Sequence, residues 1–131
     1  MGNIKREAAA EAVRVMWHAI HGVADTLDRV IACEGLAYAL AASLGGLGPF
    51  ATPSTPEETV AVIETIQVLG DTWQAGEIAG VLYGDTAAKE MGWAPLGIPQ
   101  YAGYRWAIQR ATAQVRSRGP AMALASGVLQ L

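Results

Sequence analysis

Apolar side chains recur at intervals of three and four residues over most of the sequence, and this spacing restricts the chain to helices. In the segment from Asp25 to Leu44 the recurring positions are Leu27, Val30, Ile31, Tyr38 and Ala41. Residues so spaced share one face of an α-helix, which packs against the rest of the molecule. No stretch alternates apolar and polar residues for long enough to compete as a strand. We therefore expect an all-α fold.

Glu34 lies on this apolar stripe, within Ala32-Cys33-Glu34-Gly35-Leu36-Ala37. Helical spacing directs its side chain toward the core. Burying a carboxylate costs free energy unless it is paired, hydrogen-bonded, bound to a metal or protonated. Glu34 is therefore a candidate site residue. The sequence leaves four partners open, namely His21, Arg105, a tyrosine hydroxyl and a metal ion.

Capping residues, glycines and prolines predict where the helices begin and end. The strongest signal is Thr55-Pro56-Glu57-Glu58, with an N-cap threonine, proline at the first helical position and glutamate three residues after the cap. Gly22 and Asp25 predict a break between the first two helices, although a continuous bent helix is an alternative. Asp71 and Asp85 are expected to cap later segments. The expected helical segments are 4–23, 26–43, 55–69, 71–84, a short turn over 85–92, 100–118 and 121–129.

These segments predict a single compact domain, residues 1–131, of five or six helices. The two prolines and the glycine within residues 93–99 predict an ordered loop, because its Trp93, Leu96 and Ile98 are too apolar to extend into water.

Composition adds two expectations. The chain of 131 residues is long enough to bury a core without disulfides or metal. Apolar residues make up 52% and charged residues only 16%, which is below the usual quarter. The chain thus has more apolar surface than a small monomer needs to hide. This excess indicates either a homodimer or an apolar ligand pocket.

Charge and hydropathy disfavour nucleic acid and membranes as partners. The net charge is −3, and the basic residues gather only at Arg105, Arg110, Arg116 and Arg118. Charged residues interrupt the most apolar half before it reaches the length of a membrane span. The N-terminus lacks an apolar signal core, and the single Cys33 fits a reducing compartment. We expect a cytoplasmic protein.

His18 and His21 lie three residues apart on one helical face, a spacing at which two imidazoles can bind one metal ion. If the second helix folds back on the first, the Glu34 carboxylate approaches His21. The three side chains then form a zinc site with an open position for water. The alternative is that both histidines belong to the solvent-facing polar stripe of Glu7, Glu11 and Arg14.

Four short segments occur in an order that resembles a family of predicted zinc-dependent proteases related to the gluzincins. They are Trp17-His18-Ala19-Ile20-His21, Cys33-Glu34-Gly35-Leu36-Ala37, Leu82-Tyr83-Gly84-Asp85 and Pro99-Gln100-Tyr101-Ala102-Gly103-Tyr104. The family carries a His-Glu-x-x-His helix, a Glu-Gly-Leu-Ala helix whose glutamate is the third zinc ligand, and a late aromatic-Ala-Gly-Tyr helix. The resemblance covers most of the chain, from about Val13 onward, and implies that Glu34 and His21 are metal ligands.

The metal motif is degenerate relative to that family. Trp17 stands where the first zinc-binding histidine is expected, and His18 stands where the general-base glutamate is expected. Only His21 and Glu34 remain as ligands, fewer than the three protein ligands of a catalytic zinc site. The family's proteolytic mechanism is therefore not expected. Bound zinc and the absence of any cofactor both remain open.

Two functions follow from these features. The first is a small non-proteolytic enzyme, hydrolase-like or lyase-like, in which Glu34, His18 and His21 carry acid–base chemistry on a small apolar substrate, with or without a metal. Its pocket is expected to be lined by Trp17, Tyr38, Trp73, Tyr101, Tyr104 and Trp106, with Arg105 as a further substrate-binding residue. The second is a catalytically inactive binding or assembly module, a homodimer or a binder of a partner protein, in which those aromatic residues are core.

Overall fold

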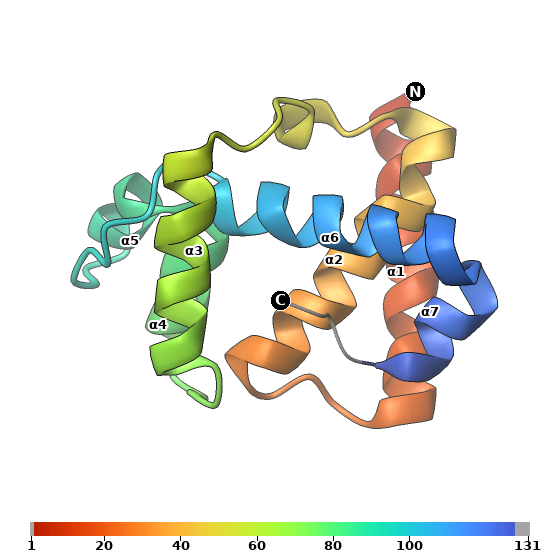
Figure 1. Ribbon diagram of the computed structural model, residues 1–131, viewed down its shortest axis with the longest axis horizontal. Helices are drawn as coiled ribbons and strands as arrows, with labels where there is room; N and C mark the ends of the chain where they lie inside the picture. Colours follow the sequence, from red (N-terminus) through yellow and green to blue (C-terminus); the bar gives the residue numbers. More distant parts are fainter. Residues whose placement is uncertain (1, 128–131) are drawn as a thin grey trace.

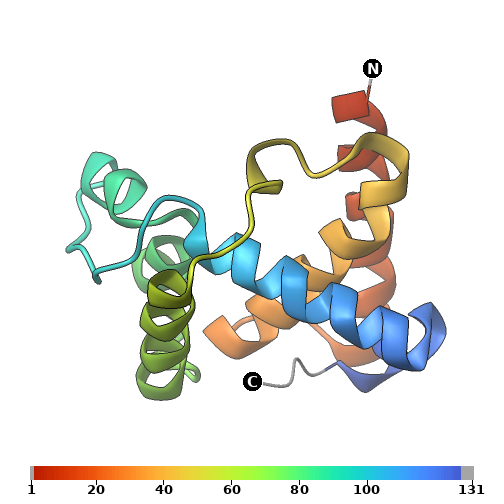
Figure 2. The same cartoon turned by 45° about the horizontal axis from the view of Figure 1, so that its top comes forward.

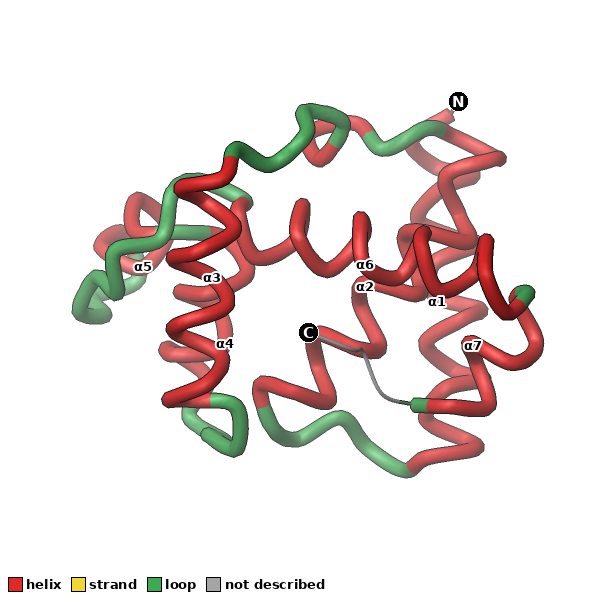
Figure 3. The backbone as a smooth tube through the Cα atoms, in the orientation of Figure 1, coloured by secondary structure: helices red, strands yellow, loops and turns green. Residues whose placement is uncertain are grey.

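The computed structural model describes residues 2–127, and within that range it contains helices and loops but no strand (Figure 3). The elements are α1 (Gly2–His21), α2 (Leu27–Gly45), the 3-10 turn η1 (Gly48–Phe50), α3 (Pro56–Leu69), α4 (Ala75–Tyr83), α5 (Asp85–Glu90), α6 (Ala102–Arg118) and α7 (Pro120–Ser126). The all-α prediction is confirmed, but the described chain has seven α-helices where five or six were expected. The short α5 accounts for the difference, since only a short turn was expected over 85–92, and packing on neighbours maintains a helix too short to persist alone.

Helix α6 crosses the middle of the molecule and contacts α2, α3, α4 and α7. In Figure 1 it runs across the view, with α3 and α4 near one of its ends and α1 and α7 near the other. The turned view in Figure 2 shows the same arrangement, with η1 bridging between the two groups. Helices α1 and α2 form the most extensive pair and run in opposite directions. The core is therefore built around α2 and α6.

Two glycines allow α6 to lie directly against its neighbours. A Cβ atom on Gly35 of α2 would stand 2.6 Å from the carbonyl oxygen of Ala107. A Cβ atom on Gly103 of α6 would overlap the carbonyl of Val81 on α4. Side chains at these two positions would push the helices apart, so both crossings depend on glycine.

The predicted break between the first two helices is confirmed. Gly22 adopts φ +83°, a left-handed conformation that ends α1 at little cost for glycine. Arg29 of α2 then donates hydrogen bonds to the carbonyl oxygens of His21 (2.5 Å) and Val23 (3.1 Å). Its guanidinium also lies 5.5 Å from the ring centre of Trp17. A cation at the C-terminal end of α1 favours the helix dipole and fixes the turn.

The start of α3 follows the prediction, and the start of α4 does not. The Glu58 amide donates to the Thr55 hydroxyl at 3.2 Å, as in the predicted N-cap. Asp71 is not an N-cap, because α4 begins only at Ala75. The segment 70–72 instead caps α2, whose Leu27 and Asp28 amides donate to the carbonyls of Thr72 and Gly70 at 2.9 and 2.8 Å. Because residues 70–72 cap α2, helix α4 begins four residues later than predicted.

Asp85 also differs from its predicted role. It is the first residue of α5, and one of its carboxylate oxygens accepts hydrogen bonds from the amides of Leu96, Gly97 and Ile98 at 3.0, 3.1 and 3.0 Å. These bonds order the proline-containing loop, as predicted. Of the apolar residues expected to avoid water, Ile98 is buried, whereas Trp93 is 42% exposed.

The remaining boundaries differ slightly from the prediction. Helix α6 begins at Ala102 instead of residue 100, after Tyr101 in a left-handed conformation with φ +60°. Helix α7 is described to Ser126, and the rest of the predicted segment 121–129 lies partly outside the described residues. Among residues 2–127 we find no helix with both the length and the apolar character needed to cross a membrane.

Candidate functional site

Glu34 is nearly buried, and both of its carboxylate oxygens have partners. Arg14 of α1 binds it with two nitrogens, Nε at 2.6 Å from Oε2 and Nη2 at 2.9 Å from Oε1. The Tyr104 hydroxyl of α6 donates to Oε1 at 2.9 Å. The Glu34 side chain is 13% exposed. The predicted inward orientation is confirmed. Of the four partners left open by the sequence, a tyrosine hydroxyl is present, and Arg14 was not among the four.

Hydrogen bonds extend from Arg14 and Tyr104 to three further side chains, Tyr38, Glu7 and Tyr83. Arg14 Nη2 donates to the Tyr38 hydroxyl at 3.2 Å, and that hydroxyl donates to Glu7 at 2.8 Å. The hydroxyls of Tyr83 and Tyr104 lie 3.5 Å apart. We call the whole set the Glu34 network. It joins α1, α2, α4 and α6 through Glu7, Arg14, Glu34, Tyr38, Tyr83 and Tyr104.

The glycine crossings explain why these groups meet. Glu34 directly precedes Gly35, where α2 touches α6, and Tyr104 directly follows Gly103, where α6 touches α4. Close backbone approach brings the adjacent polar side chains within hydrogen-bond distance of one another. The Glu-Gly and Gly-Tyr pairs of the sequence therefore form a contact between helices.

Burial and charge in the network favour fixed protonation states. Burial, reinforced by the nearby Glu34 charge, raises the pKa of Tyr104 far above its usual value. Burial alone lowers the pKa of Arg14, but the hydrogen bonds and charge of Glu34 outweigh it and raise that pKa overall. Burial and the Glu34 charge likewise raise the pKa of the Cys33 thiol to about 12. Tyr104 therefore remains a hydrogen-bond donor, Arg14 a cation and Cys33 a neutral thiol.

The structure does not bring the two histidines to Glu34. His21 Nε2 lies 2.8 Å from the carbonyl oxygen of Leu124 in α7, and its ring packs on Trp17. Arg14, which binds Glu34, lies seven residues or about two helical turns before His21 along α1. The nearest polar neighbour recorded for His18 Nε2 is the Cys33 sulfur at 3.9 Å. Among residues 2–127, no group of three or more His, Cys, Asp or Glu side chains is placed to hold a metal ion.

Arg105 does not pair with Glu34 and does not face a pocket with it. Its Nη2 donates to Glu58 of α3 at 2.7 Å, and its Nη1 donates to the carbonyl oxygen of Gln100 at 2.7 Å. The residue is 8% exposed. Arg105, one of the four partners left open for Glu34, pairs with Glu58 instead because successive residues on α6 point in different directions, so Tyr104 faces α2 while Arg105 faces α3.

The aromatic residues predicted to line one pocket lie in separate places. Trp73 is 78% exposed, in the turn before α4, and Trp106 is buried. Tyr38, Tyr101 and Tyr104 gather instead around Phe50 of η1, with ring centres 5.2, 5.5 and 4.7 Å from its ring. Phe50 was absent from the predicted set because its loop shows no helical periodicity.

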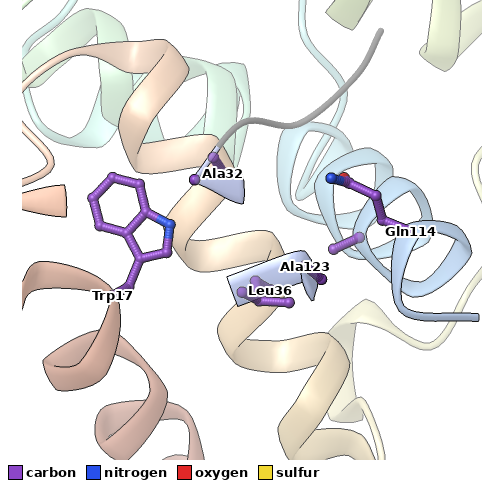
Figure 4. Close-up of a pocket in the computed structure, with 7 residues that line it drawn as sticks. Trp17, Ala32, Leu36, Gln114 and Ala123 are labelled. Carbon is purple, nitrogen blue, oxygen red and sulfur yellow. The ribbon is translucent and has the colours of Figure 1, made fainter. Parts of the chain in front are cut away.

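Trp17 packs in a different part of the core. It faces Ala32 and Leu36 of α2, while Gln114 of α6 and Ala123 of α7 lie on the other side of a small cavity (Figure 4). That cavity has a volume of only about 10 Å³, enough for one water molecule at most. It is not a substrate pocket.

A larger groove of about 380 Å³ runs between the η1 segment and α6. Its walls are apolar at Leu47, Phe50, Pro53 and Ile108, and Arg116 lies along its edge. Composition predicted either a homodimer or an apolar ligand pocket, and this groove is one of the features among the described residues that fit the second.

Helix α1 carries a second apolar face that packs on nothing in the described chain. Its buried face includes Ala10, Val13 and Trp17. The opposite face, which we call the outer face of α1, is exposed to solvent and includes Ile4, Ala8, Ala12, Val15 and Ala19, and the exposed Met16 and Ile20 lie beside it. The larger of these side chains are 45–72% exposed. Such a contiguous apolar stripe typically marks an interaction surface.

Part of the chain is similar to a known bacterial protein. An 87-residue stretch is 32% identical to the uncharacterized protein YjfC of Bacillus subtilis (strain 168). The aligned stretch covers 64% of this chain and 29% of YjfC. The chain thus spans less than a third of the length of the relative it matches. No family model and no solved structure matches the chain.

Proposed function

We propose that the chain is a helical assembly module that works by binding another protein surface, the second of the two functions suggested by its sequence. The observation that carries the proposal is the outer face of α1. A helix that needs only one apolar side to pack in its own domain carries an apolar side toward solvent as well. Burying such a face against a second helix is the ordinary way in which it is stabilised.

The state of Glu34 supports binding over acid–base catalysis. A general acid or base needs a proton or an unoccupied lone pair within hydrogen-bond distance of its substrate. Glu34 instead accepts two hydrogen bonds from Arg14 and one from Tyr104, and neither His18 nor His21 contacts it. Three of the roughly four acceptor positions of the carboxylate are thus occupied by partners within the protein. In this proposal the network holds four helices together.

Site-specific photo-crosslinking in cells tests the proposal. A benzophenone amino acid is placed at Val15 on the outer face of α1 and, as a matched control, at Val60 on α3. The two valines are 59% and 54% exposed, so solvent access is similar. We expect a discrete cross-linked species containing this chain from position 15 and none from position 60. The proposal is wrong if position 15 gives no such species or if both positions give the same pattern.

The groove beside η1 favours a second candidate, the binding of a small apolar anion. Its apolar walls fit a hydrocarbon or ring, and Arg116 fits a carboxylate or sulfonate. The fluorescent probe 1-anilinonaphthalene-8-sulfonate has both features. We expect saturable fluorescence enhancement that weakens in Arg116→Met, with Arg118→Met as the control. Equal binding by both variants would contradict this candidate.

A further inference from the structure

We infer that the groove beside η1 and a neighbouring hollow on α6 together bind an acidic peptide segment of a partner protein. Its apolar side chains occupy the two depressions, and its carboxylates bind Arg116 and Arg118. This inference rests on the second candidate function, the anion site in the groove, and names the class of its ligand. It does not depend on the outer face of α1. The shape of the surface and the charge around it support the inference.

The groove beside η1 adjoins a second depression on the same helix. This hollow has a volume of about 250 Å³ and is lined by Arg110, Ala113, Gln114, Ser117 and Arg118. The exposed Ala113 also lines the groove of about 380 Å³, so the two depressions share part of their rim. An extended peptide directs every second side chain to the same side, and adjacent depressions can receive two of them.

Every charged residue that lines the two depressions is an arginine. The chain has no charged residue between Glu34 and Glu57, a stretch that includes the second half of α2 and η1. All 12 aspartate and glutamate residues precede Met91, so arginine is the only charged residue type in α6 and α7. The basic surface is therefore local in a chain whose net charge is −3. Charge complementarity favours an acidic partner.

Arg116 and Arg118 are available to bind an anion. Both are exposed, and neither makes a hydrogen bond or an ion pair within residues 2–127. The negative end of the α6 dipole accounts for cations in this last turn. It does not account for the absence of acidic residues from the adjoining η1 segment and α7. An acidic ligand accounts for both observations, because carboxylates on those neighbours would repel it.

The walls of the groove favour a peptide over a nucleic acid. They are apolar at Leu47, Phe50, Pro53 and Ile108, which fits the hydrocarbon part of a side chain. A phosphate backbone instead needs a longer row of cations, usually on a protein of positive net charge. The combination of apolar walls and arginines at the edge is the one that an acidic peptide with apolar residues matches.

Selection from a phage-displayed library of random peptides on the full chain tests the ligand class. We expect the enriched peptides to combine aspartate or glutamate with apolar residues, and not to be enriched on the double variant Arg116→Met/Arg118→Met. Circular dichroism checks that the variant is folded. The inference is wrong if no peptide is enriched, if the enriched peptides lack acidic residues, or if the double variant selects the same peptides.

Calorimetric titration with the most enriched peptide measures the contribution of each arginine. Arg116→Met and Arg118→Met should each weaken binding by about threefold to tenfold at low salt. Lys89→Met removes the same charge from α5, on the far side of α3 and α4 in Figure 1, and should leave binding unchanged. Equal weakening by all three substitutions would show unspecific attraction and overturn the inference. Tighter binding of a short single-stranded DNA through the same two arginines would also overturn it.

This inference and the second candidate function fail in distinguishable ways. Arg118 does not line the groove, so a small anion bound there depends on Arg116 and not on Arg118. If 1-anilinonaphthalene-8-sulfonate depends on Arg116 and no acidic peptide is selected, the peptide is wrong and the small-anion candidate stands. If neither ligand depends on Arg116, both are wrong. Cross-linking at position 15 tests the assembly function separately.

Discussion

Two adjacent residues of α6 reach two different arginine–glutamate ion pairs, and the pairs differ in how completely they are satisfied. Tyr104 donates to Glu34, whose carboxylate is held by Arg14, while Arg105 itself binds Glu58. All three nitrogens of Arg14 have hydrogen-bond acceptors, whereas the buried Nε of Arg105 has none among residues 2–127. Arginine–glutamate ion pairs thus connect α6 to its neighbours on two sides. The pair with α1 and α2 belongs to the Glu34 network, whereas the pair with α3 stands alone.

This difference bears on the enzyme hypothesis. Its place in an apolar helix stripe makes Glu34 a candidate catalytic group. Glu58, whose sequence position predicts only a capping role, nevertheless makes a similar contact with an arginine. Partial burial with an arginine partner is therefore a recurring means of joining helices in this protein. It does not by itself distinguish a catalytic carboxylate.

The largest expected effect is that of Arg14→Met. The substitution leaves the Glu34 carboxylate nearly buried with only Tyr104 as a partner, so the free energy of unfolding should fall by about 3 kcal/mol. Urea denaturation measures it. The double variant Arg14→Met/Glu34→Met should recover part of the loss, since no unpaired charge remains. A single variant as stable as the wild type would contradict a structural role for the pair.

A smaller loss is expected from Arg105→Met. Glu58 is 19% exposed and regains water more readily than Glu34, so we expect a decrease of about 1.5 kcal/mol in unfolding free energy. The same urea titration gives the value, and exposed Arg118→Met is the control. A loss larger than that of Arg14→Met would reverse the comparison between the two pairs.

Tyr104→Phe isolates the hydroxyl that connects α6 to the Glu34 network. Removing one hydrogen bond to a carboxylate that keeps its arginine should cost about 1 kcal/mol. Tyr101→Phe is the matched control, because the Tyr101 hydroxyl makes no hydrogen bond within residues 2–127. Thermal unfolding of both variants measures the difference. Equal melting temperatures would mean that the Tyr104 bond contributes nothing to stability.

Alkaline pH tests the burial of Cys33 beside the network. Its pKa is about 12 when folded, against an ordinary value of 9.0. An acid with a raised folded pKa stabilises the protein below its ordinary pKa, and this contribution is lost as the pH rises toward the folded pKa. Between pH 8 and 10 we expect Cys33 to account for a loss of about 1 kcal/mol.

The control for this titration is Cys33→Ala, in which the slope of unfolding free energy against pH should flatten over the same range. A variant with the wild-type slope would show that the thiol does not titrate differently in the folded and unfolded states.

Local sequence signals predicted the helices well where the cause was local. The Thr55-Pro56 start of α3 and the Gly22 break depend only on neighbouring residues, and both are confirmed. The start of α4 was wrong because the carbonyls of Gly70 and Thr72 cap α2, a contact between distant segments. Periodicity also predicted that Glu34 faces inward.

The partner of Glu34 was not predictable in the same way. Arg14 lies in a polar stripe with Glu7 and Glu11, which suggested solvent exposure, and only the packing of α1 on α2 brings it to Glu34. One signal was available in retrospect. Glu34-Gly35 and Gly103-Tyr104 each place a polar side chain next to a glycine, which is the arrangement that forms where helices cross closely.

The Tyr104–Glu34 hydrogen bond also bears on the order of folding. Its two residues are separated by 70 positions in the chain, whereas Arg14 and Glu34 are separated by 20. Closing the longer loop costs more chain entropy and depends on α6 docking. We therefore expect the α1–α2 pair to form first. The Tyr104–Glu34 hydrogen bond then forms when α6 packs on that pair. A partly folded chain is therefore expected to form the Arg14–Glu34 ion pair before the Tyr104–Glu34 hydrogen bond, whose formation marks the completed fold.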